Sequence, residues 1–540
     1  MKVKFYTRRQ CQHLLPKMLL LFVLLILGNL SYAQGIQVTG SVTSVEGDPL
    51  IGASVVVEGT TNGAIADFDG KFSLNAPKNA VLIISSVGYT SQKVTLNGQT
   101  VINVKLAADI KTLGEVVVIG YGTQRKETVT GSVASIGGEE LNQVASSNIT
   151  QALQGRVSGV ELSANSSKPG AAMQIRIRGT RSLNASNDPL IVLDGIPFGG
   201  TIGDINPSDI KSLDILKDAS ATAIYGSRGA NGVILITTTK GKKGQKPRIS
   251  YSGYQGIKTV FAKYPMMSGE KLSKLRADAG VYSTNGLDEV AGTNTDWQDL
   301  MYSSAMTTSH DLSVSGGTEK SNYKFGLGYY KDESVLPNED YSRLSLRSSI
   351  DQEINDYISV GFTSNNSYSV TNNGRGIYSI LSASPLVNPY NTDGSFKRMF
   401  SMPADDAWTE TRSTLEALGD KSINQSRGVS SYNSVYAEVK IPGVEGLKFR
   451  TNVGLNFNQG NGGSYTGEGV FSTNPSTLSS ATVSNSRGTG WTSENLLTYD
   501  RVFAEKHRIN VVALYSAEKS TYNRSHMTVK GVTSDAFQFY

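Results

Sequence analysis

The stretch Leu447–Phe457, LKFRTNVGLNF, decides the fold class of this 540-residue chain. One face of the expected strand carries apolar side chains and a single threonine: Leu447, Phe449, Thr451, Val453, Leu455 and Phe457. The other face carries polar side chains: Lys448, Arg450, Asn452, Asn456 and Asn458. Because side chains alternate across a strand, this pattern predicts a strand with an apolar outer face and a polar inner face, which is typical of membrane β-barrels.

The same alternation recurs from about residue 246 onward. We expect nine strands, near 248–257, 307–314, 323–330, 343–350, 357–368, 434–441, 447–457, 491–500 and 508–516. The longer connections are 258–306, 331–342, 369–433 and 458–490, and short ones alternate with them. This asymmetry is expected of external loops and periplasmic turns. A large soluble β-sandwich is the alternative, and the export signal described next favours the barrel.

Residues 1–33 have the organisation of a secretory signal peptide. The segment has a basic start, an apolar run at Met18–Leu27 and the small-x-small site Ser31-Tyr32-Ala33. Ten apolar residues are too few for a transmembrane helix, which needs roughly 20. We therefore expect cleavage between Ala33 and Gln34. Membrane insertion would then require a β-barrel, because backbone polar groups must be satisfied in lipid.

Removal of this leader changes what the composition implies. The chain has 51 basic and 46 acidic residues, and loss of the leader's five basic residues leaves 46 of each. The basic pI of the whole chain therefore gives no argument for nucleic-acid binding. Cys11, the single cysteine, is lost too, so the exported chain needs no disulfide framework.

Enzyme chemistry has little support in the sequence. His310, His507 and His526 do not have metal-ligand spacing, and no nucleophile-elbow motif is present. Asp405 and Asp406 are adjacent in an expected loop, which is weak support for acid–base catalysis. We expect no enzymatic activity, no cofactor and no metal.

Residues 34–108 predict a small β-sandwich. Short alternating strands, such as Ile36–Val42, are separated by regularly spaced turn clusters. Asp67 and Asp69 stand in one such cluster, and we expect a tight turn there rather than a calcium loop, because further ligands are missing.

The segment 109–125 is expected to be a linker that carries one strand, Glu115-Val116-Val117-Val118-Ile119-Gly120-Tyr121. Its β-branched residues favour a strand, and no nearby hairpin partner is evident. Unpaired backbone groups of this kind can accept a strand from another protein.

Residues 126–245 predict a mixed α/β module. We expect a short helix ending near Gly155, strands at 173–178, 190–193, 212–217 and 233–238, a helical turn capped by Ser208 and a second short helix at 221–225. Gly226, Gly229 and Gly232 precede a strand rather than a helix, so they predict a tight turn and not a phosphate site.

Three segments in this order resemble the plug of SusC/RagA-like TonB-linked outer-membrane proteins: LGEVVVIGYGTQRKETVTGSV, IRIRGTRSLNASNDPLIVLDGIPFGG and ATAIYGSRGANGVILITTTKGKKG. The run GDPLIGASVVVEGTTNGAIADFDGKFSL resembles the carboxypeptidase-regulatory-like sandwich that precedes the plug in this family. The resemblance implies a mainly β protein in which an α/β plug sits in a large antiparallel transmembrane barrel.

The resemblance also implies function. Val116 to Tyr121, with Glu115, would form the TonB-box strand that pairs with TonB, energised by ExbB and ExbD. The matched plug residues are Arg176, Arg178, Gly179, Asp194, Gly195, Gly226, Arg228, Gly229 and Gly232. Import of a glycan or peptide nutrient across the outer membrane with a SusD-like lipoprotein is the expected function. A TonB-linked signal transducer and a non-transporting surface-binding barrel are the alternatives.

Arg176 and Arg178 project from one face of an expected strand, so their charges need carboxylates or a polar lumen. We expect plug–barrel ion pairs rather than substrate contacts. Some aromatic residues of the long connections suit stacking on sugars or packing on peptides, although loop packing or a place in the interface girdle explains each one more simply. They are Tyr390, Phe400, Trp408, Tyr465 and Phe471.

The strands of residues 246–540 are too few for the resembled barrel of about 22, which alone is wide enough for a plug. The sequence therefore predicts an N-terminal fragment of a protein roughly twice as long. Substrate-contacting residues and oligomeric state are not predicted.

Overall fold

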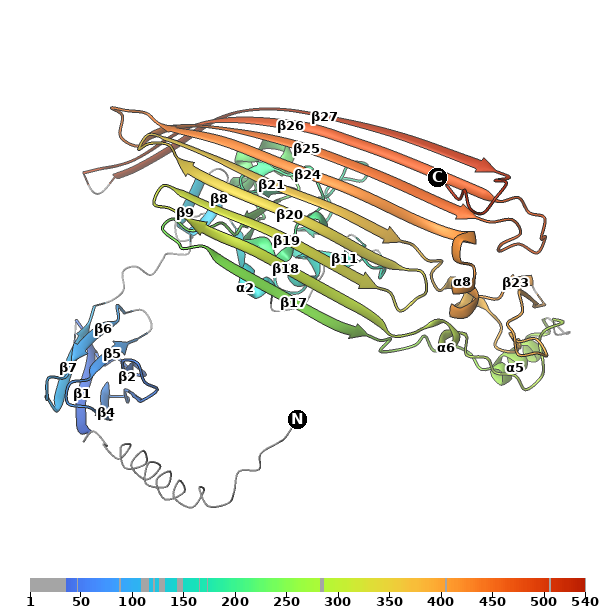
Figure 1. Cartoon of the computed structure of the whole chain (residues 1–540), viewed down its shortest axis with the longest axis horizontal. Coiled ribbons are helices and arrows are strands. Elements are labelled where there is room, and N and C mark those ends of the chain that lie inside the picture. Colours follow the sequence, from blue (N-terminus) through green and yellow to red (C-terminus); the bar gives the residue numbers. More distant parts are fainter. Residues whose placement is uncertain are drawn as a thin grey trace, which may run out of the picture. The chain divides into compact units, whose positions relative to one another are not determined.

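The chain is described by a computed structural model covering residues 35–45, 47–86, 89–107, 116–119, 122–125, 132–142, 149–164, 166–171, 173–281, 286–403, 406–504 and 507–539. It divides into two compact units, Met1–Val116 and Val117–Tyr540. Each unit is described by itself below (Figure 1).

The first unit is a β-sandwich, as the turn spacing predicts. One sheet has the order β4-β1-β7 and the other the order β3-β2-β5-β6. The strands are β1 (Ile36–Ser44), β2 (Ser54–Val57), β3 (Gly63–Ile65), β4 (Lys71–Ala76), β5 (Val81–Ser85), β6 (Gln92–Thr95) and β7 (Val101–Leu106). Alternate residues such as Val38, Phe72 and Ile84 are buried between the sheets. The Asp67 carboxylate accepts hydrogen bonds from the backbone N–H groups of Asp69 and Lys71, which confirms the tight turn.

The segment after the sandwich contains a hairpin. β8 (Val116–Ile119) pairs with β9 (Gly122–Arg125) in a two-stranded sheet. The prediction that this strand has no nearby partner is therefore wrong. The polar sequence of β9, GTQR, has no apolar alternation and so gave no strand signal. Glu115, Gly120 and Tyr121 lie outside the described residues.

The plug module that follows is built on a five-stranded sheet with the order β10-β15-β16-β13-β14. Its strands are β10 (Val133–Gly137), β13 (Leu190–Leu193), β14 (Ile196–Pro197), β15 (Ile210–Leu216) and β16 (Val233–Thr238), and a separate hairpin joins β11 (Val160–Ala164) to β12 (Met173–Ile177). The helices are α2 (Gly138–Leu141), α3 (Ile149–Leu153), α4 (Ala219–Thr222), η2 (Ile202–Asp204), η3 (Pro207–Asp209) and η4 (Ala223–Gly229). Leu213 and Ile234 are buried on one face of the sheet and Leu216 and Leu235 on the other, which explains its continuous apolar strands.

The predicted helical turn at Ser208 exists, but its cap is a different residue. Asn206 is the N-cap of η3, and its side chain accepts a hydrogen bond from the Ser208 N–H. Pro207 occupies the first position of the turn, where a missing N–H has no cost.

A nine-stranded antiparallel sheet forms the rest of the second unit, with its strands in chain order (Figure 1). They are β17 (Arg248–Lys258), β18 (Ala305–Gly317), β19 (Ser321–Glu333), β20 (Asp340–Glu353), β21 (Ile358–Asn372), β24 (Ser422–Lys440), β25 (Leu447–Thr466), β26 (Ser480–Phe503) and β27 (His507–Lys530). All nine predicted strands are present. β24, β25, β26 and β27 extend well beyond the predicted ranges.

The two faces of this sheet differ as the alternation predicts. Leu327, Leu346 and Leu455 point away from the plug and are 47%, 53% and 54% exposed. Lys324, Arg347 and Glu494 lie on the opposite face and are 8%, 3% and 0% exposed. The exposed face of the sheet is apolar and the face against the plug is polar. A soluble protein has the opposite arrangement, so this sheet is better suited to a wall that faces lipid.

The long connections at one end of the sheet are folded. They contain α5 (Gly269–Ala279), α6 (Trp297–Met301), α7 (Tyr378–Ser382), α8 (Arg412–Ala417), η5 (Gly419–Lys421), β22 (Met399–Ser401) and β23 (Asp406–Trp408). Six buried side chains form what we term the loop cluster: Trp297, Met301, Ile380, Val387, Phe400 and Leu415. Phe400 packs on Trp297 at 5.1 Å between ring centroids, and Trp408 packs edge-on against Phe471 at 5.4 Å. Loop packing therefore accounts for these aromatic residues.

Candidate functional site

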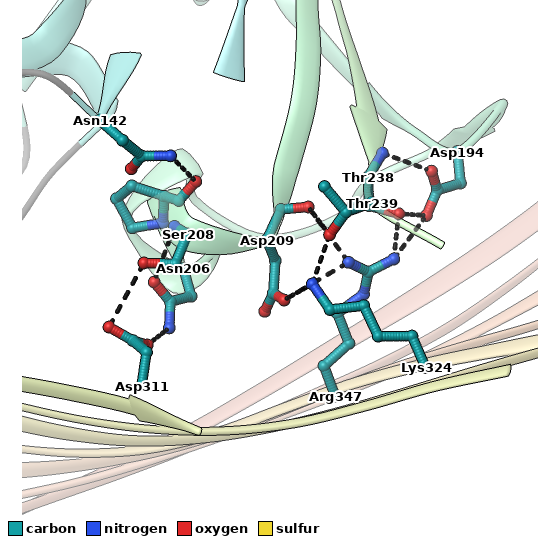
Figure 2. Close-up of polar contacts among 11 residues, drawn as sticks. Asn142, Asp194, Asn206, Ser208, Asp209, Thr238, Thr239, Asp311, Lys324 and Arg347 are labelled. Carbon is teal, nitrogen blue, oxygen red and sulfur yellow. Dashed lines mark hydrogen bonds and ion pairs between the residues drawn. The ribbon is translucent and has the colours of Figure 1, made fainter. Parts of the chain in front are cut away.

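The plug meets the nine-stranded sheet through a polar cluster, which is the best-defined candidate site (Figure 2). We define the plug–sheet cluster as Asp194, Asp209, Thr238 and Thr239 from the plug with Lys324 and Arg347 from the sheet. Lys324 lies on β19 and Arg347 on β20, and both side chains point at the plug from the face that the alternation predicts to be polar.

Asp194 and Gly195 form the tight turn between β13 and β14. Their φ angles are +50° and +91°. Positive φ at both central residues matches the type I′ hairpin turn that Asp-Gly favours. This turn directs the Asp194 carboxylate toward β16, where its Oδ1 accepts a hydrogen bond from Thr238 N at 2.9 Å and its Oδ2 one from the Thr238 hydroxyl.

Two buried cations bind the other plug carboxylate. Lys324 Nζ lies 2.9 Å from Asp209 Oδ1 and also donates to the Thr239 hydroxyl. Arg347 lies 3.7 Å from Asp209 Oδ1 and 3.6 Å from Asp194 Oδ2, and it donates to Asp209 O at 3.2 Å. The cluster thus pairs two carboxylates with two cations away from water, so loss of any one charge would leave its partner poorly compensated.

Further contacts continue along the same wall. Asn206 and Ser208 of the plug donate to the Asp311 carboxylate on β18, and Asn142 reaches Pro207 O at 3.5 Å (Figure 2). Lys240, just after β16, donates to both carboxylate oxygens of Asp351 on β20 at 3.1 Å. The plug is therefore fastened to β18–β20 at the end of its sheet where β15 begins and β16 ends.

The predicted arginines form a different contact from the one expected. Arg176 pairs with Asp188 at 2.6 Å, inside the plug, so the expected plug–barrel ion pair is wrong for this residue. The Arg176 hydrogen bond lowers the pKa of the Asp188 carboxyl below its usual value. Arg178 adopts φ +57° and precedes Gly179 at φ +85°, so the two residues turn the chain after β12.

The glycine run has the turn geometry that its sequence predicts. Gly226 and Gly232 adopt φ of +58° and +89°, and a Cβ on Gly232 would lie 2.6 Å from Ile177 Cδ1. Gly229 packs against Thr222 with similarly little space. Arg228 leaves this run to pair with Glu518 on β27 at 2.6 Å, and so provides the plug–sheet ion pair expected of the other arginines.

Several functional residues were missed by sequence reasoning. Asp209, Asp311, Lys324 and Arg347 lie far apart in the chain, and none stands in a recognised motif. One sequence signal could have indicated them. Charged residues at inward-facing positions of barrel strands need counter-charges in the lumen. Nothing in the sequence pairs them with particular plug residues.

The remaining predicted sites lie outside this cluster. Val116, Val117, Val118 and Ile119 form β8, and the cleavage residues Ala33 and Gln34 lie outside the described residues, as does Asp405. No helix in the described part of the chain is long and apolar enough to span a membrane. The described residues contain no grouping of His, Cys, Asp or Glu suited to a metal ion.

Two family models match this chain. The TonB-dependent Receptor Plug Domain matches residues 125–233, and the CarboxypepD_reg-like domain matches residues 38–118. These are the modules expected from the sequence resemblance.

Curated relatives extend the match. The chain is 34% identical to TonB-dependent receptor P26 of Formosa agariphila over 93% of this chain and 51% of that protein. It is 43% identical to TonB-dependent receptor SusC of Bacteroides thetaiotaomicron over 58% of this chain and 32% of that protein. The match covers about half the length of P26 and about a third of the length of SusC.

Solved structures agree on the fold. The RagAB peptide importer in its open-open state is similar with a TM-score of 0.70 and 25% identity, over 79% of this chain and 51% of that chain. Plug, preceding sandwich and the antiparallel wall thus all agree with one family. The chain belongs to the SusC-like TonB-dependent receptors.

Proposed function

We propose that the protein takes part in TonB-dependent import of a nutrient across the outer membrane. The observation that carries this proposal is a plug fastened by buried ion pairs to the polar face of a sheet whose other face is apolar and exposed. A plugged pore needs energy to open, whereas an adhesive surface needs none. A strand at 116–119, just before the plug, supports coupling to TonB with ExbB and ExbD.

The placement follows from the same proposal. The leader would direct export, and the sandwich (34–108), the linker (109–125) and the short turns would face the periplasm. The plug (126–245) would close a lumen whose wall is built by residues 246–540. The folded long connections would then face outward, where a SusD-like lipoprotein could cover them.

The cargo is proposed to be an oligosaccharide or a peptide. The relatives include a receptor named SusC and a structure described as a peptide importer, and the two suggest different cargo classes. The described part of the chain contains no residue set that separates these classes.

The test is deletion of residues 115–121 in cells that produce the protein. Uptake of labelled cargo should fall to background, while binding to de-energised cells should remain. The amount of the deleted protein in the outer membrane, compared with that of the wild type, is the control for general disturbance. Unchanged uptake after the 115–121 deletion would favour the passive, surface-binding alternative. Retained uptake together with lost induction of a cargo-responsive reporter would favour the signal transducer.

A further inference from the structure

A cavity of about 920 Å³ lies between the plug and the short-turn end of the sheet. We term it the short-turn cavity. Ser220, Ala223 and Ile224 of α4 and η4 line one side, and the connection 441–446 with the adjoining ends of β25–β27 lines the other. Its volume lies within the range of about 300–1,000 Å³ usual for small-ligand pockets.

The cavity adjoins the place where the chain enters the plug. The backbone N–H of Ser132 donates to the Asp218 carboxylate, and β10 begins one residue later. Asp218 is also the N-cap of α4, since its Oδ1 accepts a hydrogen bond from Ala221 N at 2.9 Å. One carboxylate therefore joins the first described residue of the plug module to the helix that borders the cavity.

We expect β10 to separate from β15 starting at its Val133 end. It is an edge strand that pairs only with β15, and Val133 faces Leu216 beside Asp218. A pull on the chain before Ser132 would break the Asp218 contact and then the β10–β15 ladder one pair at a time. The other end of β15 lies next to Asp209, which Lys324 and Arg347 hold to the wall. Seven residues of strand, roughly 23 Å, separate the freed end from the held end.

We infer that the short-turn cavity is the vestibule through which cargo leaves the plug, and that the Ser132–Asp218 contact keeps α4 across it. This inference rests on the proposed import function. Loss of the Ser132 contact detaches Asp218, the N-cap residue of α4, from the end of β10, although Asp218 Oδ1 still accepts the Ala221 N–H. The plug side of the cavity then loosens while the plug–sheet cluster keeps the rest in place.

The lining indicates the chemistry of the cargo. Aliphatic side chains such as Ile224 and Val444 alternate with charges of both signs, including Lys440, Lys448 and Asp500. A lining of mixed sign disfavours cargo with a large net charge. The lining instead suits a compact molecule with both polar and aliphatic surface. Neutral oligosaccharides and short zwitterionic peptides both meet this description.

The experiment fills the vestibule. Ala223 is exposed and lines the cavity, so Ala223→Trp should obstruct it, whereas Ala230→Trp places the same side chain at an exposed position outside the lining. Uptake of radiolabelled maltohexaose and of radiolabelled penta-alanine is measured in energised cells, and binding is measured in de-energised cells. We expect Ala223→Trp to lower uptake of the imported probe at least tenfold with binding unchanged within twofold, and Ala230→Trp to behave as the wild type.

A cysteine version covers the case in which the tryptophan disturbs folding. Only Cys11 of the leader is a native cysteine, so Ala223→Cys supplies a unique thiol after cleavage. The imported probe should slow maleimide labelling of this thiol at least threefold and leave Ala230→Cys unaffected. Normal uptake by Ala223→Trp, or equal labelling of both thiols, would overturn the vestibule while import stands. A wild type that takes up neither probe would overturn the import function and the vestibule with it.

Discussion

Replacement of Arg347 by methionine is the sharpest test of how the plug is held. The change keeps an unbranched stem but removes the guanidinium charge of a residue that is 3% exposed and lies near both Asp194 and Asp209. Breaking a buried ion pair typically costs about 3–5 kcal/mol. The lower limit applies here, because Lys324 still pairs with Asp209 and Thr238 N still donates to Asp194. A cost of about 3 kcal/mol corresponds to a roughly 100- to 200-fold increase in local opening.

Hydrogen–deuterium exchange of peptides that cover β16 measures this opening, since exchange tracks local unfolding. The amides of Thr238 and Thr239 are the reporters, because they donate to Asp194 and to Asp209 O. Lys258→Met is the matched control, since it breaks an ion pair with Asp332 that lies wholly within the sheet. β16 exchange in Arg347→Met that stayed within threefold of the wild type, or an equal rise in Lys258→Met, would refute the role of Arg347 in holding the plug to the sheet.

Three further outcomes are expected. The Ser132 hydrogen bond, followed by that of Ala221, lowers the pKa of Asp218 from its usual 3.8, with a smaller contribution from the Arg178 charge. The stabilisation is therefore complete above pH 3.8 and is lost as pH falls through the lowered pKa. The protection of β10 amides, which is their exchange relative to the intrinsic rate at each pH, should therefore fall with acid in the wild type but stay constant in Asp218→Asn. Gly232→Ala should destabilise the plug by more than about 1 kcal/mol, because φ is +89° and the new Cβ would meet Ile177; faster exchange of β12 and β16 checks this, and equal exchange in the two proteins would contradict it. Trp297→Ala should remove about 3–5 kcal/mol from the loop cluster and speed proteolysis within 373–421, whereas Tyr378→Ala, at an 85% exposed position, should not; equal cleavage of both variants would refute the loop cluster as a folded unit.

The wall could be predicted from sequence because lipid and lumen impose alternation on every strand. Leu447–Phe457 shows the pattern clearly, and its outward residues Phe449, Val453 and Leu455 are exposed in the structure. The pattern fails at Ser480–Gly490, SATVSNSRGTG, which belongs to β26 although small and polar residues occupy both faces. A strand without an apolar face carries no periodic signal, so the predicted strand starts too late.

The site was predicted only in part, because its two halves are joined by folding and not by sequence. Asp194-Gly195 predicts a turn, and the glycine run Gly226–Gly232 predicts another. The counter-charges of Asp209, however, are Lys324 and Arg347, which lie 115 and 138 residues away. Arg176 shows the converse, since its nearer partner Asp188 took the place of the expected wall contact.

The length of β26 has a consequence for the cell surface. Its 24 residues extend roughly 80 Å, or about 60 Å in height at the tilt usual for barrels, whereas an apolar band is about 25 Å tall. Above Phe457 and Trp491 the residues of the outward parity become polar, with Gln459, Asn461 and Arg487. In the proposed membrane placement, the connection 467–479 then stands tens of ångströms above the lipid, several times the Debye length of about 8 Å at physiological salt. Charges on an arriving polymer would be screened from the membrane surface there, so its capture would depend on the wall and loops alone.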